Sequence, residues 1–284
     1  MPTVVTRVQS FTSSSASGPG PTQVSVTLRE VLQADYGLYT WPASFVLARH
    51  LWRHRARYLH AQSPLPPRGI PPPLALAPSR PARVLELGAG TALPGLLLAK
   101  LGACVTLTDA VHQPEVLANL EAACRVNSLE ISGPASPPPL GGRAPANLAR
   151  SISVCGLTWG TTDAAALQLA SHGFDLVVGA DVLYSRGRDF DRLLATVRLL
   201  LDHSEGGAGV FVTAYQHRSA HRSLEALIQL WGLEVRRVWQ PGGDEDGHED
   251  EDGAGPSSGL TVDVVEIVLA SRSISRCNLK HDRL

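Results

Sequence analysis

Segments with strand-like apolar runs alternate along this chain with segments whose apolar residues have helical spacing. Short apolar runs rich in β-branched residues predict strands, whereas apolar residues three or four positions apart predict helices. We expect strands over residues 83–87, 103–108, 151–157, 174–180 and 208–214, and helices over residues 94–101, 113–127, 188–201 and 219–231. Strands that alternate with helices in this way indicate a parallel sheet with helices on both faces.

The segments on either side of this alternating core have different patterns. Residues 233–239 and 261–269 form two strand-like runs with no helical pattern between them, so we expect an antiparallel hairpin at one edge of the sheet. Upstream, residues 24–32 alternate loosely, which predicts an edge strand or hairpin, and residues 43–60 form an amphipathic helix. The predicted fold class is α/β, with a seven-strand, Rossmann-like, mostly parallel sheet, an antiparallel terminal hairpin and helices on both faces.

The length and composition favour one domain with a tail at each end. The chain has 284 residues, of which 44% are apolar, and this is ample for a full core over residues 30–272. Residues 1–29 contain no acid and many Ser and Thr, which predicts a disordered tail, and residues 273–284 form a second tail. Within the domain, residues 133–148 and 242–255 are rich in Gly and in Pro or acids, so we expect flexible inserts there.

Charge and cysteine content narrow the classes of partner. The formal net charge of −1 gives no basic field, so we expect no direct nucleic-acid binding. The four cysteines have no C-x-x-C spacing and are typical of reduced thiols in an intracellular protein. No stretch approaches the ~18 apolar residues of a membrane span, so we also expect no membrane contact.

The strongest chemical signal is a strand that runs directly into a glycine turn. Residues 84–91 read Val-Leu-Glu-Leu-Gly-Ala-Gly-Thr and precede a predicted helix, so the backbone at Gly88 and Gly90 can approach a ligand at the N-terminus of that helix. A second strand-like run ends in Asp109, about twenty residues after the first glycine, where an acid is expected to accept two ribose hydroxyls. Together these features predict an adenosine-containing cofactor.

Two residues favour S-adenosylmethionine over NAD as that cofactor. Leu93 occupies the place of the third glycine of a dinucleotide fingerprint, and the next glycine is Gly95. Glu86 would repel a pyrophosphate but suits the sulfonium and amino group of S-adenosylmethionine. An NAD-dependent oxidoreductase is the first alternative, and a cofactor-binding scaffold that transfers nothing is the second.

Several blocks of sequence resemble the seven-strand S-adenosylmethionine-dependent methyltransferases of methyltransferase family 16. Those typical of the family are residues 86–95, Asp109 and Ala-Asp-Val-Leu-Tyr at residues 180–184, which matches its Asp-x-x-Tyr motif. Those that resemble one branch of the family are residues 36–42, 156–160 and 215–220. The resemblance covers roughly residues 34–272 and keeps the blocks in order.

The resemblance implies roles for eight residues. The cofactor-binding residues would be Trp41, Glu86, Gly88, Gly90, Asp109 and Trp159. The catalytic residues, which would face the methyl acceptor, are Asp181 and Tyr184. In these roles Glu86 and the two glycines contact the methionine moiety, Asp109 holds the ribose and Trp159 covers the adenine. One departure from the family is Thr158, where many members have an aspartate before the tryptophan.

Methyl transfer from a sulfonium needs an aligned neutral nucleophile and the exclusion of water, and it requires no metal. Although His217 and His221 are four residues apart, the chain offers no obvious third ligand, so we expect no metal site. Asp181 would orient a cationic acceptor group, on which Tyr184 would stack. The resembling branch implies a protein substrate, a histone arginine, and hence a location in nucleus and cytoplasm. The wider family implies lysines of non-histone proteins.

Overall fold

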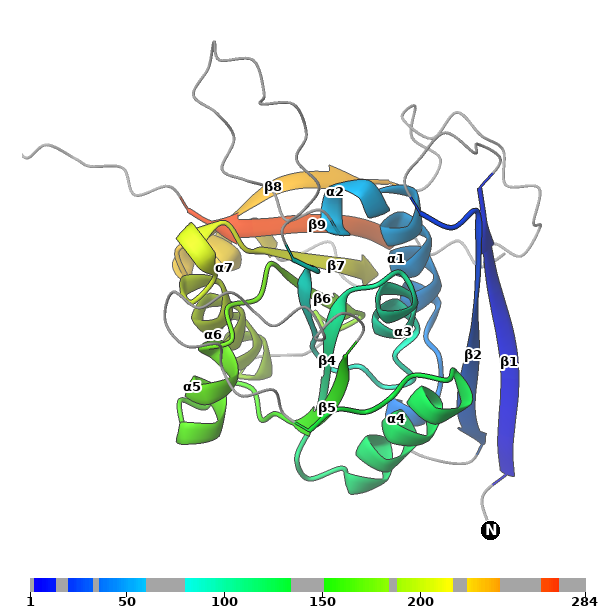
Figure 1. Ribbon diagram of the computed structural model, residues 1–284. Coiled ribbons are helices and arrows are strands. Elements are labelled where there is room, and N and C mark those ends of the chain that lie inside the picture. The colour runs from blue at the N-terminus through cyan, green and yellow to red at the C-terminus, as the bar shows by residue number, and fades with distance from the viewer. Residues whose placement is uncertain are drawn as a thin grey trace, which may run out of the picture.

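The structure is a computed structural model of the chain (Figure 1). It describes residues 3–13, 20–32, 36–59, 80–133, 151–183, 188–216, 224–240 and 262–270. The predicted inserts over residues 133–148 and 242–255 fall almost entirely outside these ranges, as does the predicted tail over residues 273–284. Among the described residues, no helix combines the length and the apolar character needed to cross a membrane.

A seven-stranded sheet forms the centre of the molecule, in the order β5-β4-β3-β6-β7-β9-β8. Its strands are β3 (Arg83–Glu86), β4 (Cys104–Asp109), β5 (Ile152–Gly156), β6 (Leu176–Ala180), β7 (Val210–Gln216), β8 (Leu233–Trp239) and β9 (Val262–Leu269). The first five are parallel, whereas β9 is antiparallel to both β7 and β8. The predicted α/β class and the antiparallel terminal hairpin are therefore confirmed, and β9, the last strand among the described residues, inserts between β7 and β8.

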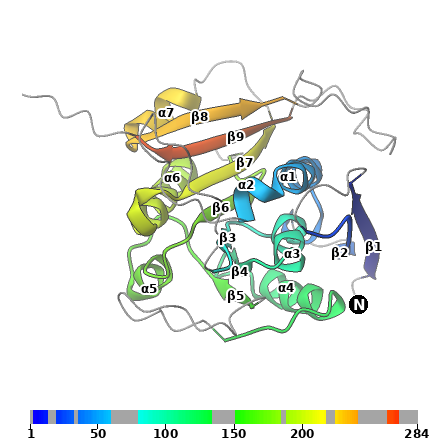
Figure 2. The same cartoon turned by 45° about the horizontal axis from the view of Figure 1, so that its top comes forward.

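Helices cover both faces of this sheet (Figures 1 and 2). One face carries α1 (Pro42–Arg53), α2 (Arg55–Leu59), α3 (Leu93–Lys100) and α4 (Pro114–Val126). The other carries α5 (Ala164–Ala170), α6 (Arg188–Asp202) and α7 (Leu224–Leu230). Each face of the sheet has its own hydrophobic core: the first lies under α1, α3 and α4, and the second under α5 and α6. Because side chains alternate along a strand, Val84 of β3 belongs to the first core and Leu85 to the second.

The helix α5 is one element that the sequence pattern did not predict. It is only seven residues long, Ala-Ala-Ala-Leu-Gln-Leu-Ala, and its three leading alanines give no apolar periodicity. The local signal was its N-cap, because the Asp163 carboxylate accepts a hydrogen bond from the Ala166 amide at 2.9 Å. The helix predicted over residues 43–60 is divided into α1 and α2 at His54.

The prediction of a disordered tail over residues 1–29 is wrong for most of that segment. Residues Thr3–Thr12 form β1 and Gln23–Leu32 form β2, which pair antiparallel over ten residues as a separate two-stranded sheet. The edge strand or hairpin predicted over residues 24–32 is confirmed as β2, in which Val24, Val26 and Leu28 alternate with polar residues and are buried in the first core. The Ser and Thr content that suggested disorder is also compatible with a strand.

Helix α4 and the residue that directly follows it hold the backbone of β2 through two asparagine side chains. The Asn127 side-chain oxygen accepts the Thr27 amide at 2.9 Å, and its nitrogen donates to the Thr27 carbonyl at 2.7 Å. The Asn119 side chain donates to the Arg29 carbonyl at 3.0 Å. These amides replace the partners that a further strand would supply, so the hairpin is fixed to the domain by polar as well as apolar contacts.

Replacement of Leu28 by alanine tests whether this hairpin belongs to the folded domain. Leu28 is fully buried, so Leu28→Ala should lower the free energy of unfolding by about 2–5 kcal/mol, as measured by urea denaturation. Val8, on the outer face of β1, is 62% exposed, and Val8→Ala should change that free energy by no more than about 0.5 kcal/mol. Equal stabilities for the two variants would contradict the packing of the hairpin.

Candidate functional site

The carboxyl ends of the parallel strands bring most of the predicted site residues together. Glu86 is the last residue of β3 and Asp109 is the last residue of β4. Trp159 lies just after β5, and Asp181 directly follows β6. Since β5, β4, β3 and β6 are neighbours in the sheet, these four residues lie along one edge, where ligands of open α/β sheets bind.

The glycine turn after β3 has the conformation that its two glycines predict. Both Gly88 and Gly90 have positive φ, at 57° and 55°. A Cβ at Gly88 would lie 3.2 Å from the Trp159 ring and from Val182, and a Cβ at Gly90 would lie 3.2 Å from the carbonyl oxygen of Gly37. Trp159 therefore packs directly on the turn, as expected for a residue that covers a ligand there.

Asp109 has a structural task that the sequence did not reveal. One carboxylate oxygen, Oδ2, accepts the Gly90 amide at 2.9 Å, and Oδ1 accepts the Ala110 amide at 2.8 Å. Burial raises the pKa of Asp109, while these two backbone hydrogen bonds oppose the shift. Each carboxylate oxygen can accept more than one hydrogen bond, so Asp109 can anchor the turn and still accept ribose hydroxyls.

Glu86 is buried against the first turn of α3. Glu86 is only 1% exposed, and its Oε2 accepts a hydrogen bond from the Gly95 amide at 2.9 Å. A Cβ at Gly95 would overlap Glu86 and Leu107. Gly95 therefore allows the close helix packing that the third glycine of the dinucleotide fingerprint would allow at position 93. Burial, with a contribution from Asp109, raises the pKa of Glu86 to about 8, against the opposing hydrogen bond from Gly95.

The segment between the hairpin and α1 forms a wall of the glycine turn. It begins with the 3-10 turn η1 (Tyr36–Leu38) and ends at Trp41, the residue before α1. The Thr40 and Thr91 hydroxyl oxygens are hydrogen-bonded at 2.9 Å, which ties the segment to the residue after Gly90. Trp41 therefore directly follows a residue that contacts the turn. Its ring is half-buried and lies edge-on to the Tyr39 ring, with 5.6 Å between the two ring centroids.

Asp181 has an unusual backbone conformation for its position. Its φ of 55° is left-handed, and the residue is only 8% exposed, with its amide donating to the Ala214 carbonyl at 3.0 Å. Aspartate tolerates this region better than most residues, but a buried, left-handed residue at a strand end is typical of functional sites. Tyr184, the other predicted catalytic residue, lies outside the described residues, as do His217 and His221. Over the described ranges, no three metal-ligating side chains gather.

Asp263 also lies at this edge, although the sequence pattern did not place it there. It pairs with Tyr215 across the β7–β9 ladder and is buried. Because β9 is antiparallel to β7, its first residues lie beside the carboxyl end of β7, and β7 alone separates them from β6, the strand that Asp181 follows. The available signal was an acid within the otherwise apolar start of the strand, Val-Asp-Val-Val, but the hairpin pattern did not place this strand next to β7.

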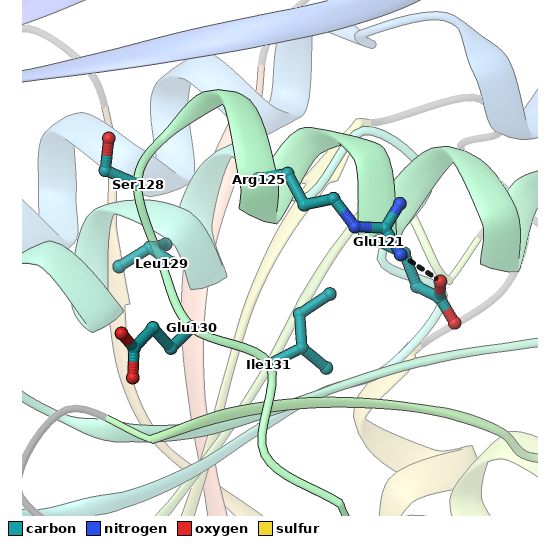
Figure 3. Close-up of a pocket in the computed structure, with 6 residues that line it drawn as sticks. All are labelled: Glu121, Arg125, Ser128, Leu129, Glu130 and Ile131. Atoms are coloured by element: carbon teal, nitrogen blue, oxygen red, sulfur yellow. Dashed lines mark hydrogen bonds and ion pairs between the residues drawn. The ribbon is translucent and has the colours of Figure 1, made fainter.

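A surface pocket lies away from these residues (Figure 3). It is formed by the C-terminal half of α4 and the turn after it, with Glu121, Arg125, Ser128, Leu129, Glu130 and Ile131 as its lining. The Arg125 guanidinium and the Glu121 carboxylate are paired at 2.8 Å along one turn of the helix. None of the eight predicted site residues lines this pocket, so the candidate site is the edge formed by the strand ends.

Comparison with known proteins places this geometry in a family. The model of a family described as lysine methyltransferase, family 16, matches residues 22–138. The chain is 35% identical to histone-arginine methyltransferase METTL23 of Xenopus laevis, over 78% of this chain and 75% of that protein. Identity to the Homo sapiens protein of the same name is 32%, over 71% and 82% of the two chains. Protein N-lysine methyltransferase METTL21A of Danio rerio is 34% identical over 54% and 58%.

The family match over residues 22–138 includes the glycine turn and the ends of β3 and β4. The alignments with the two METTL23 relatives cover more than two thirds of this chain and of each relative. Membership of this family favours S-adenosylmethionine over NAD as the cofactor. The chain belongs to the METTL23 group of methyltransferase family 16 and is an S-adenosylmethionine-dependent protein methyltransferase.

Proposed function

We propose that this protein methylates an arginine side chain of a histone, at the edge where Asp181 follows β6. The observation that carries the site is the buried, left-handed Asp181 beside the strand that ends in the glycine turn. The choice of a histone arginine follows the names of the METTL23 relatives. A histone acceptor implies work on chromatin, so we propose a nuclear as well as a cytoplasmic location.

The residues present fit S-adenosylmethionine, which supplies a methyl group on an electrophilic sulfonium. Gly88 and Gly90 adopt the left-handed conformation that lets the backbone turn sharply after β3, and they allow Trp159 and the Gly37 carbonyl to pack closely on this turn. In this proposal Asp109 accepts hydrogen bonds from the ribose, and Trp159 covers the adenine from its place against Gly88. The Glu86 carboxylate balances the positive charge of the methionine amino group.

Asp181 acts on the acceptor. A guanidinium has a pKa above ~12 and a lysine ammonium ~10.4, so either arrives protonated. Its nitrogen gives up a proton to the Asp181 carboxylate or to water, and the N–CH3 bond forms as the S–CH3 bond breaks and S-adenosylhomocysteine leaves. Charge-assisted hydrogen bonds to the Asp181 carboxylate hold the cationic group in line with the S–CH3 bond, and they strengthen in a site from which water is excluded. Tyr184, three residues later, completes the family motif as a stacking partner.

The acids at this edge favour a guanidinium over an ammonium as acceptor. Asp181 follows β6 and Asp263 is the second residue of β9, and only β7 lies between these two strands. Guanidinium presents five N–H donors in a planar fork and suits carboxylates on more than one side, whereas an ammonium is a compact charge. The competing candidate is a lysine of a non-histone protein, favoured by the description of the matching family model.

Methyl transfer from isotopically labelled S-adenosylmethionine tests the proposal. Core histones and a whole-cell lysate serve as substrates, and mass spectrometry identifies the labelled residue. We expect label on a histone arginine, with Asp181→Asn lowering kcat by at least about 100-fold. Asparagine also adopts the left-handed region, so this variant should keep its fold and its affinity for S-adenosylhomocysteine.

The control is Asp202→Asn at the exposed end of α6, which removes only an ion pair with Arg198 and should leave kcat unchanged. Label on lysine would overturn the arginine assignment, and full activity of Asp181→Asn would overturn the role of that carboxylate. Binding of S-adenosylhomocysteine without any transfer would favour the scaffold alternative.

The pH dependence of cofactor binding tests the role of Glu86. Because its pKa in the unliganded protein is about 8, above the ordinary value of 4.5, the unliganded protein should lose stability as the pH rises between these values. A cation bound beside Glu86 favours the ionised carboxylate. The affinity for S-adenosylmethionine, relative to that of Glu86→Gln, should therefore rise with pH up to about 8.

Isothermal titration calorimetry from pH 6 to pH 9 measures this ratio. The cofactor amine itself titrates near pH ~8, and the comparison with the Gln variant removes that contribution because both proteins bind the same ligand. An affinity ratio that does not vary with pH would show that Glu86 does not pair with the cofactor's charge.

A further inference from the structure

We propose that Glu30, on the N-terminal hairpin, is a positioning residue of the cofactor site: it holds residues 37–41 in place over the glycine turn. Glu30 interrupts an otherwise apolar series, because it continues the inward-facing positions Val24, Val26 and Leu28 of β2. It is 3% exposed. A buried carboxylate at an apolar position is unfavourable unless it is paired, so its contacts indicate what it does.

Each oxygen of Glu30 has a partner from a different segment. Oε1 accepts the backbone amide of Thr40 at 3.1 Å, within the segment between the hairpin and α1. Oε2 accepts a guanidinium N–H of Arg7 at 3.2 Å, from β1. The Arg7 side chain is half exposed, so the pair adds little stability, but its charge balances that of the carboxylate. The buried half of this arrangement is the bond to Thr40.

Two hydrogen bonds connect Glu30 with the glycine turn. The first is the bond to the Thr40 amide, and the second joins the Thr40 and Thr91 hydroxyls at 2.9 Å. Both threonines are buried, and Thr91 directly follows Gly90. The carbonyl oxygen of Gly37, in the same segment, lies 3.2 Å from the position that a Cβ of Gly90 would take. The segment is therefore in contact with the turn at two points.

Loss of Glu30 would release this segment. Without the carboxylate, the buried Thr40 amide has no acceptor, and an unsatisfied buried N–H is avoided by a shift of the backbone. Trp41 is the next residue and begins α1 without a side-chain cap, so a shift at Thr40 moves it directly. The hairpin then is a working part of the cofactor site and not merely a cover for the first core. This inference rests on the proposed role of the turn in cofactor binding.

The test is S-adenosylhomocysteine binding by isothermal titration calorimetry, with three variants of the full chain. Glu30→Leu removes the acceptor while filling the apolar surroundings, and we expect its affinity to fall by about tenfold or more. Glu30→Gln keeps an oxygen for the Thr40 amide and should bind within about threefold of wild type. Arg7→Gln, which changes only the exposed partner, should also bind within that range.

A purely structural role predicts a different result. In that case Glu30→Leu lowers the thermal midpoint, yet the protein still folded at 15 °C binds S-adenosylhomocysteine as wild type does, and this outcome would overturn the proposal. Thr91→Val removes the hydrogen bond between the Thr40 and Thr91 hydroxyls and leaves Glu30 in place, so it provides a test even if Glu30→Leu does not fold. Wild-type affinity of the Thr91→Val variant would also overturn the proposal. Because binding is measured without methyl transfer, an inactive wild type counts only against the proposed acceptor chemistry.

Discussion

The close contact between β3 and α3 is the constraint on which the rest of this site depends. Glu86, at the end of β3, is buried beneath the first turn of α3 and accepts the Gly95 amide, and only glycine fits at that point of the helix. This contact fixes where the helix starts and so determines the length and shape of the turn that carries Gly88 and Gly90. A carboxylate with a raised pKa is thereby placed at the centre of the site.

Other parts of the fold hold the turn from outside. Asp109 anchors it from β4 through the Gly90 amide, and the segment after the hairpin anchors it through Thr91. Trp159, in the loop after β5, packs on Gly88. A single turn is thus fixed by two neighbouring strands and by the N-terminal hairpin, which arranges groups for a ligand before it binds and reduces the ordering needed on binding.

The parts of the fold that depend on local sequence were predictable, and those that depend on distant pairing were not. Periodicity located the core strands and most helices, and the positive φ of Gly88 and Gly90 followed from the motif. β1 was missed because Ser and Thr suggested disorder, whereas the alternation that includes Val26 and Leu28 did predict an edge strand or hairpin over residues 24–32, where β2 lies. The contacts of Glu30 with Thr40 and the insertion of β9 beside β7 arise only when the chain has folded.

The most direct test of the central claim is a crystal structure with S-adenosylhomocysteine bound. We expect the amino-acid moiety of the ligand to lie against Gly88 and Gly90, with the ribose hydroxyls within hydrogen-bond distance of Asp109 and the adenine beside Trp159. A ligand bound elsewhere, such as in the pocket beside α4, or one with its ribose turned away from Asp109, would contradict the account.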